Sequence, residues 1–197
     1  MIGRDTRWPL AVVLIFIVMV SGAHAQQRVR GAGRTAVAGE KAVRFYNPVL
    51  DGRGFFMSRE LRKNDAIVLS FFATWCVPCR KELPEFQELS RAFPGGKIAW
   101  RLVNSGDKPD SIRAFLRKLS VRVPVLLDRY LKTTRRYAGD PPRLPTTVII
   151  GRDSIVRYLH HGYDGDDGLA GIAREIARIL DRPVPKQWRE PEPESTP

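Results

Sequence analysis

Strand-like apolar runs alternate with amphipathic helical segments through most of this chain, and that order limits the folds open to it. The most apolar run, AIVLSFF at residues 66–72, has the composition of a central strand covered on both faces. Further strands are predicted over 98–103, 123–127, 146–150 and 154–160. With the intervening helices, the order is βαβαβαββα. It predicts an α/β domain in which a central mixed β-sheet, with parallel inner strands, is flanked by helices.

Helices are indicated by apolar residues at spacings of three and four. One is predicted directly after residue 79 and ends before the Pro-Gly-Gly segment at 94–96. Pro84 lies within it and is expected to kink it. A second helix is expected to begin at a cap formed by Asp110 or Ser111, and a third over 129–138. A final helix is expected to begin at a cap formed by Asp166 or Asp167. The apolar residues of 42–64, with a turn at 51–54, predict a small N-terminal β-hairpin extension.

The two ends of the chain differ in composition from the middle. Arg4 and Arg7 precede an apolar run of 11 residues, which a small-x-small site at 23–25 follows. This layout is typical of a secretory signal peptide, and the run is well short of the roughly 20 residues that span a bilayer. An uncleaved membrane anchor remains an alternative. The predicted organisation is a signal peptide (1–25), a flexible linker (26–41), the α/β domain (42–181) and a disordered Pro/Glu-rich tail (182–197).

The chain's only two cysteines, Cys76 and Cys79, lie where the central strand gives way to a helix. Unpaired N–H groups at a helix N-terminus favour a thiolate over a thiol, and such positions can lower a cysteine pKa to about 3.5–7.5. A bridge closing so short a loop would gain only about 2 kcal/mol from chain entropy. A redox role therefore explains the pair better than a stabilising one.

The net charge of +12 comes from basic residues scattered along the chain. A solvated basic surface accounts for this pattern, and electrostatic steering toward acidic proteins or anionic membranes is the alternative. The charge alone would fit a nucleic-acid role, but the export signal argues against that partner.

Residues 75–79 (Trp-Cys-Val-Pro-Cys), at the end of an apolar strand, resemble the active site of the thioredoxin superfamily. The downstream segment 144–147 (Leu-Pro-Thr-Thr) resembles the cis-proline loop of that superfamily. Glu82, the hairpin and the signal peptide narrow the resemblance to the exported TlpA/ResA-type branch. The likeness covers roughly residues 42–181 and implies a thioredoxin fold.

The resemblance implies a role for each residue of the motif. Cys76, as the more exposed sulfur, would attack a disulfide, and Cys79 would resolve the mixed disulfide that results. The redox-active disulfide of these two residues would be the only redox group, without a further cofactor or metal. Val77 and Pro78 would tune its reduction potential, while Trp75 would form an apolar wall beside Cys76 unless it is an ordinary core aromatic.

Two further positions follow from the same resemblance. Glu82 lies one helical turn after Cys79 and would transfer protons, with a solvated surface glutamate as the alternative. Pro145 would be cis and would let the backbone of Leu144 pair with an extended substrate peptide. Ser70 occupies the place of a buried aspartate of cytoplasmic thioredoxins, which leaves proton handling to Glu82 or water. The stretch before the proline, 139–143, is longer than usual.

The implied function is that of an exported, periplasmic thiol–disulfide oxidoreductase that reduces disulfides of client proteins, with cytochrome c maturation as one context. Its partners would be those clients and a membrane-linked thiol electron donor. An oxidant of the same fold and a non-catalytic basic binding module remain alternatives.

Two other chemistries fit the residues less well. A zinc site would need His160 and His161 together with the cysteines, but adjacent strand residues point to opposite faces. A peroxidase of related fold would need a Pro-x-x-x-Thr-x-x-Cys pattern, whereas Thr74 stands only two residues before Cys76.

Overall fold

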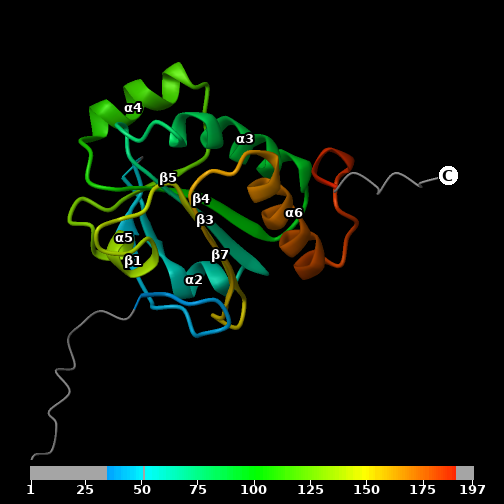
Figure 1. The fold of residues 1–197 in the computed structure, drawn as a ribbon. Helices are drawn as coiled ribbons and strands as arrows, with labels where there is room; N and C mark the ends of the chain where they lie inside the picture. The colour runs from blue at the N-terminus through cyan, green and yellow to red at the C-terminus, as the bar shows by residue number, and fades with distance from the viewer. Residues whose placement is uncertain (1–34, 51, 190–197) are drawn as a thin grey trace, which may run out of the picture. The chain divides into compact units, whose positions relative to one another are not determined.

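A mixed sheet of five strands forms the centre of the domain (Figure 1). The computed structural model describes residues 35–50 and 52–189. The five strands are β3 (Ala66–Phe72), β4 (Ile98–Asn104), β5 (Val125–Leu127), β6 (Thr146–Gly151) and β7 (Val156–His161). They lie in the order β5-β4-β3-β6-β7, with β3, β4 and β5 parallel and β6 and β7 antiparallel to their neighbours. This confirms the mixed sheet predicted from the sequence.

Helices cover both faces of the sheet, as Figure 1 shows. One face packs against α3 (Cys79–Ala92), α4 (Pro109–Lys118) and α6 (Asp166–Leu180). The opposite face packs against α2 (Met57–Leu61), α5 (Lys132–Tyr137) and the hairpin of β1 (Tyr46–Pro48) and β2 (Gly54–Phe56). The predicted N-terminal hairpin is therefore present, whereas α2 was not predicted.

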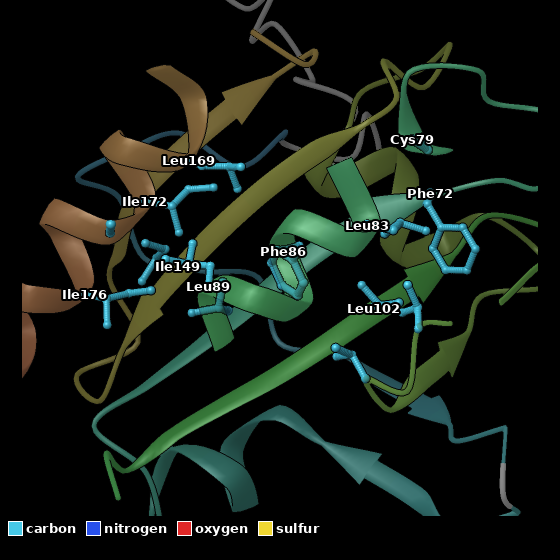
Figure 2. Close-up of a cluster of buried hydrophobic side chains, with 14 of the residues drawn as sticks. Phe72, Cys79, Leu83, Phe86, Leu89, Leu102, Ile149, Leu169, Ile172 and Ile176 are labelled. Carbon is cyan, nitrogen blue, oxygen red and sulfur yellow. The ribbon is translucent and has the colours of Figure 1, made fainter. Parts of the chain in front are cut away.

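Strand β3 is buried along its whole length and divides the two cores. Val68 and Phe72 pack on the α3–α6 side, and Leu69 and Phe71 pack on the other side. Because strand side chains alternate between faces, Ser70 also lies on the α3–α6 side. Figure 2 shows the core on that side, with side chains from α3 and α6 meeting above the sheet. Burial of each large apolar side chain there stabilises the fold by about 1.5–3 kcal/mol.

Helix α3 begins at Cys79, directly after Pro78. Pro78 has a φ of −64°, which already suits a helix, and it has no N–H group that would need a partner. The helix continues through Pro84 and ends at Ala92, close to the predicted stop. Its start thus coincides with the second cysteine, which fixes both sulfurs at one end of the helix.

The caps predicted for two helices are wrong. Helix α4 follows Lys108 and has Pro109 in its first turn, so Asp110 lies inside the helix. Helix α6 follows Gly165, whose φ of 64° suits glycine better than other residues. In both places the fixed or unusual backbone of Pro or Gly, rather than a side-chain cap, sets the start.

The folded domain extends beyond the predicted range 42–181 at both ends. The Ala36 side chain is buried, its N–H donates to the Arg136 carbonyl at 2.6 Å, and Lys41 pairs with Ile155. Residues 35–41 are thus packed on the domain and are not a flexible linker. At the other end, Trp188 in the short helix η1 (Lys186–Trp188) is 7% exposed and belongs to the core under α6. The domain therefore continues beyond Asp181.

The predicted signal peptide, residues 26–34 and the end of the tail from 190 lie outside the described residues. Within the two described ranges, none of the helices combines the length and the apolar character needed to cross a membrane.

Candidate active site

Cys76 and Cys79 are joined by a disulfide at the junction between β3 and α3. Their Cα atoms are 5.3 Å apart, and Cys79 is the first residue of α3. The Cys79 N–H donates to the Cys76 sulfur at 3.2 Å. The end of the helix that carries partial positive charge therefore points at Cys76. When the bridge is reduced, this arrangement favours negative charge on the Cys76 sulfur.

Exposure around the bridge differs from the expectation for Cys76. The residue is 3% exposed and Cys79 is fully buried, so Cys76 is only marginally the more accessible of the two. The exposed groups are its neighbours, Trp75 at 66% and Val77 at 65%. Trp75 is thus not a core aromatic. These two apolar side chains form a rim beside the disulfide, because the turn that carries them leads straight into the buried start of α3.

Asp107 fixes the turn that precedes Trp75. Its carboxylate accepts bonds from the Thr74 N–H at 2.7 Å and from the Thr74 hydroxyl at 3.0 Å. The Asn104 amide donates to the same carboxylate at 2.9 Å, and its side-chain oxygen accepts from the Asp107 N–H. Sequence reasoning missed these residues, because only the parallel pairing of β3 with β4 brings them together. They hold the site's first turn to the end of β4.

Glu82 is 4% exposed and lies one helical turn after Cys79. Its Oε1 accepts hydrogen bonds from the Ser70 hydroxyl at 2.8 Å and the Thr147 hydroxyl at 3.2 Å. Burial raises the pKa of Glu82 from 4.5 to about 7, the two hydroxyl bonds oppose that rise, and the charge of Glu85 adds to it. The carboxyl can therefore change its charge near neutral pH, as a group that handles protons must.

The Leu144–Pro145 peptide bond is cis, as the resemblance implied, and so is Asp140–Pro141, which was not expected. Pairing of Phe71 with Thr146 places Pro145 at the end of the sheet that leads to Cys76. The Pro145 carbonyl accepts a 2.8 Å hydrogen bond from the Gly162 N–H. The loop containing Leu144 and Pro145 is thus fastened at the same end of the domain as the disulfide.

The side chain of His161 supports this loop from the face opposite to Glu82. Arg143 Nη2 lies 2.7 Å from His161 Nε2, and the Thr146 hydroxyl lies 2.8 Å from His161 Nδ1. The Thr146 hydroxyl also contacts the Arg143 carbonyl at 2.5 Å. Burial, then the charge of Arg143, lowers the pKa of His161. A neutral His161 therefore links the residues on both sides of the cis-proline, a role that the sequence did not indicate.

The two adjacent histidines point to opposite faces, as predicted, because His160 lies beside Glu82 and Thr147 in a small cavity. Among residues 35–50 and 52–189, no three or more His, Cys, Asp or Glu side chains gather as metal ligands. The cysteine sulfurs are bonded to each other.

Several known proteins are similar to this chain in sequence. Residues 38–159 match the model of the AhpC/TSA family. The thiol-disulfide oxidoreductase ResA of Geobacillus kaustophilus is 30% identical over 130 residues, which are 66% of this chain and 72% of that protein. ResA of Halalkalibacterium halodurans is 28% identical over 127 residues, 64% of this chain and 70% of that protein.

A solved structure gives the same result for the fold. The crystal structure of a thiol:disulfide interchange protein of the thioredoxin family, from Chlorobium tepidum, superposes with a TM-score of 0.59 at 21% identity. The match covers 74% of this chain and 99% of that one. By family model, by relatives and by fold, the chain belongs to the AhpC/TSA family and, within it, to the thioredoxin-fold proteins of the ResA type.

Proposed function

We propose that this thiol–disulfide oxidoreductase reduces disulfide bonds in client proteins through Cys76 and Cys79. The observation that carries the proposal is the disulfide at the N-terminus of α3, with the buried carboxyl of Glu82 one turn further along the helix. Its curated relatives are named thiol-disulfide oxidoreductases, which supports the same chemistry. The direction of electron flow and the nature of the clients are proposals.

The reaction begins with the reduced dithiol. The Cys76 thiolate, stabilised by the Cys79 N–H, attacks one sulfur of the client disulfide. An S–S bond forms between Cys76 and the client, and the other client sulfur leaves as a thiolate that takes a proton from solvent. The exposed Trp75 and Val77 provide apolar contacts for the client around the attacking sulfur.

Cys79 then resolves the mixed disulfide. It must first lose its proton, and the Glu82 carboxylate is placed one turn away to accept it. The Cys79 thiolate attacks Cys76, the Cys76–Cys79 bond forms, and the second client sulfur leaves as a thiolate. In total the client gains two electrons and Cys76–Cys79 is oxidised.

Glu82 also bears on the direction of electron flow. An ionised carboxylate near the two sulfurs disfavours their thiolates, which makes the reduced form less stable and the dithiol a better electron donor. We expect a reduction potential more negative than the approximately −120 mV of the strong oxidant DsbA. A membrane-linked thiol donor would return the disulfide to the dithiol after each turnover.

The site of action proposed for this chain is the periplasm or a comparable extracytoplasmic space. The pattern of residues 1–25 supports export, and that compartment is where protein disulfides form and persist. Apocytochromes c are the proposed clients, because their cysteines must be reduced before haem is attached.

Reduction of insulin by the purified chain, with a chemical reductant as electron source, tests the activity. The natural chain should accelerate the reaction, and Cys76→Ser should abolish the acceleration. Cys79→Ser should still attack but stop at a covalent mixed disulfide, which mass spectrometry identifies together with its client. No acceleration by the natural chain would overturn the proposed activity.

A further inference from the structure

We propose that His160 carries protons between the buried carboxyl of Glu82 and solvent, through one water molecule held in a cavity between them. The proposal deepens the proposed function and rests on it, because it gives the proton that Cys79 releases a path out of the protein. It adds to the site a residue of the edge strand β7.

A row of polar side chains crosses the sheet below α3 and leads to His160. The strand register places Ser70 opposite Thr147 and Thr147 opposite His160. Ser70 and Thr147 both donate to Glu82 Oε1. Their partner His160 lies on the outermost strand of the sheet. The row therefore connects the buried carboxyl with the edge of the sheet.

A small cavity lies at the end of this row. It is lined by Glu82, Thr147 and His160, and by Gly168, Leu169 and Ile172 of α6. Its volume is about 10 Å³, close to the least that accommodates one water molecule. A carboxyl, a hydroxyl and an imidazole on its walls provide the two to four polar partners that a buried water requires.

The loop between β7 and α6 also lines the cavity. Its residues Gly162, Tyr163, Asp164 and Gly165 complete the lining. The Tyr163 hydroxyl donates to Glu85 Oε1 at 2.7 Å, which ties the loop to α3. The Gly162 N–H bond to Pro145 ties the other side of the loop to the cis-proline segment. These two bonds fasten the loop that lines the cavity to α3 and to the cis-proline segment.

The surroundings of His160 suit that role. In the described part of the chain, its buried Nε2 has no aligned hydrogen-bond partner. Asp164 has Oδ2 at 3.2 Å from Nε2, close enough to stabilise an imidazolium. The His160 side chain as a whole is 24% exposed, so the ring reaches from the buried cavity to solvent. Imidazole is the side chain that most readily gains and loses a proton near neutral pH.

The proton step is balanced without any further reactant. Glu82 takes the proton of Cys79 and gives one to the water, which passes one to His160 Nε2. The imidazolium, beside Asp164, then releases a proton from Nδ1 to solvent. Other charged or titratable groups around this path include Glu85 on α3, Tyr158 and His161 on β7, Tyr163 in the loop and Arg174 on α6.

Stopped-flow reaction of the reduced full chain with 5,5′-dithiobis(2-nitrobenzoate) tests the proposal, because it separates two steps. The first release of the coloured thiolate reports attack by Cys76, and the second reports resolution by Cys79. The measurement is made in weak buffer at about pH 6, below the value of about 7 for Glu82, so that the carboxyl must lose a proton before resolution.

His160→Phe keeps a flat ring without nitrogens, and His160→Gln keeps a polar group that does not titrate. In both variants we expect the second release to slow about tenfold and the first to keep its rate. Added imidazole should restore the second release in His160→Gly. Arg157→Gln, on the same strand but away from the cavity, should behave like the natural chain. Thermal melts of the oxidised variants show that each one folds.

The relay is overturned if the second release in His160→Gln keeps the natural rate. It is also overturned if the second release in His160→Gly is slow and added imidazole does not restore it. A high-resolution crystal structure of the oxidised chain without a water between Glu82 and His160 overturns it as well. In either case the natural chain would still reduce insulin, so the proposed function would stand. Failure of the proposed function would appear instead in the first release and in the insulin assay.

Discussion

The Ser70 hydroxyl donates a 2.8 Å hydrogen bond to Glu82 Oε1 and thereby joins the middle of β3 to the first turns of α3. At this position a buried aspartate would put a second carboxyl beside Glu82. The serine supplies a donor instead, so one carboxyl serves the site, and its charge is held in place by two hydroxyls. The proton chemistry therefore depends on Glu82 and on the Ser70 and Thr147 hydroxyls that donate to it.

Replacing Glu82 by Gln should slow resolution about a hundredfold and remove the rise of the resolution rate around pH 7, because the amide cannot accept the Cys79 proton. Attack by Cys76 should be affected much less. The two releases in the stopped-flow assay, measured from acid to alkaline pH, provide the check. Glu88→Gln, an exposed change on the same helix, is the matched control. An unchanged pH profile in Glu82→Gln would remove this residue from the mechanism.

The raised pKa of Glu82 predicts how stability changes with pH. The folded protein holds a proton on this group that the unfolded chain has lost between pH 4.5 and about 7. Its contribution to stability is fully present below pH 4.5 and is lost as the pH rises through about 7. A shift of this size corresponds to about 3 kcal/mol.

Urea unfolding of the oxidised natural chain and of Glu82→Gln measures this effect. The free energy of unfolding of the variant, relative to the natural chain, should rise by about 3 kcal/mol between pH 4.5 and 8. Taking the difference between the two proteins cancels the titration of the other groups. A difference that does not change with pH would mean that Glu82 titrates normally.

Ser70→Ala and Thr147→Val each remove a donor to the Glu82 carboxylate. Since those bonds lower the pKa of Glu82, each change should raise it, by about one unit for a bond to a charged group. The pH at which the rate of resolution by Cys79 rises should move upward by the same amount. Ser90→Ala, which removes a local hydroxyl bond to Gln87 further along α3, serves as the control. If this pH is unchanged in both variants, the assigned hydrogen bonds to Glu82 are contradicted.

Trp188 should contribute to stability, although the composition around it predicted a disordered tail. Trp188→Ala should lower the free energy of unfolding by about 3 kcal/mol, because a large buried ring would leave a cavity. Chemical unfolding of the two proteins measures the loss. Lys186→Ala, in the same short helix, should change it little. Equal stability of natural chain and Trp188→Ala would show that the segment is not part of the core.

Long apolar runs and periodic apolar patterns predicted the fold well. The run 66–72 became β3 with the same bounds, because seven consecutive buried residues leave little choice. Helix α2 was missed since it has only five residues, two of them buried, and no periodicity can develop over that length. The packing of Trp188 was missed because one tryptophan among prolines and charges has no local pattern.

The candidate site was predictable only where its residues are neighbours in the sequence. Cys76 lies three residues before Cys79, the first residue of α3, and Glu82 lies in the first turn, so their proximity follows from the spacing alone. The contacts of Glu82 with Ser70 and Thr147 depend on sheet register, which the sequence did not specify. The low exposure of Cys76 likewise depends on how the turn packs, whereas the spacing reports only that it precedes the helix.

The rate at which Cys76 is alkylated in reduced Cys79→Ser, followed from acid to alkaline pH, tests the central claim most directly. If the N-terminus of α3 holds the Cys76 sulfur as a reachable thiolate, iodoacetamide should modify it faster at pH 7 than free cysteine, whose pKa is about 8.5. The reaction should also keep its rate below the pH at which free cysteine stops reacting. A rate at or below that of free cysteine would contradict the mechanism at its first step.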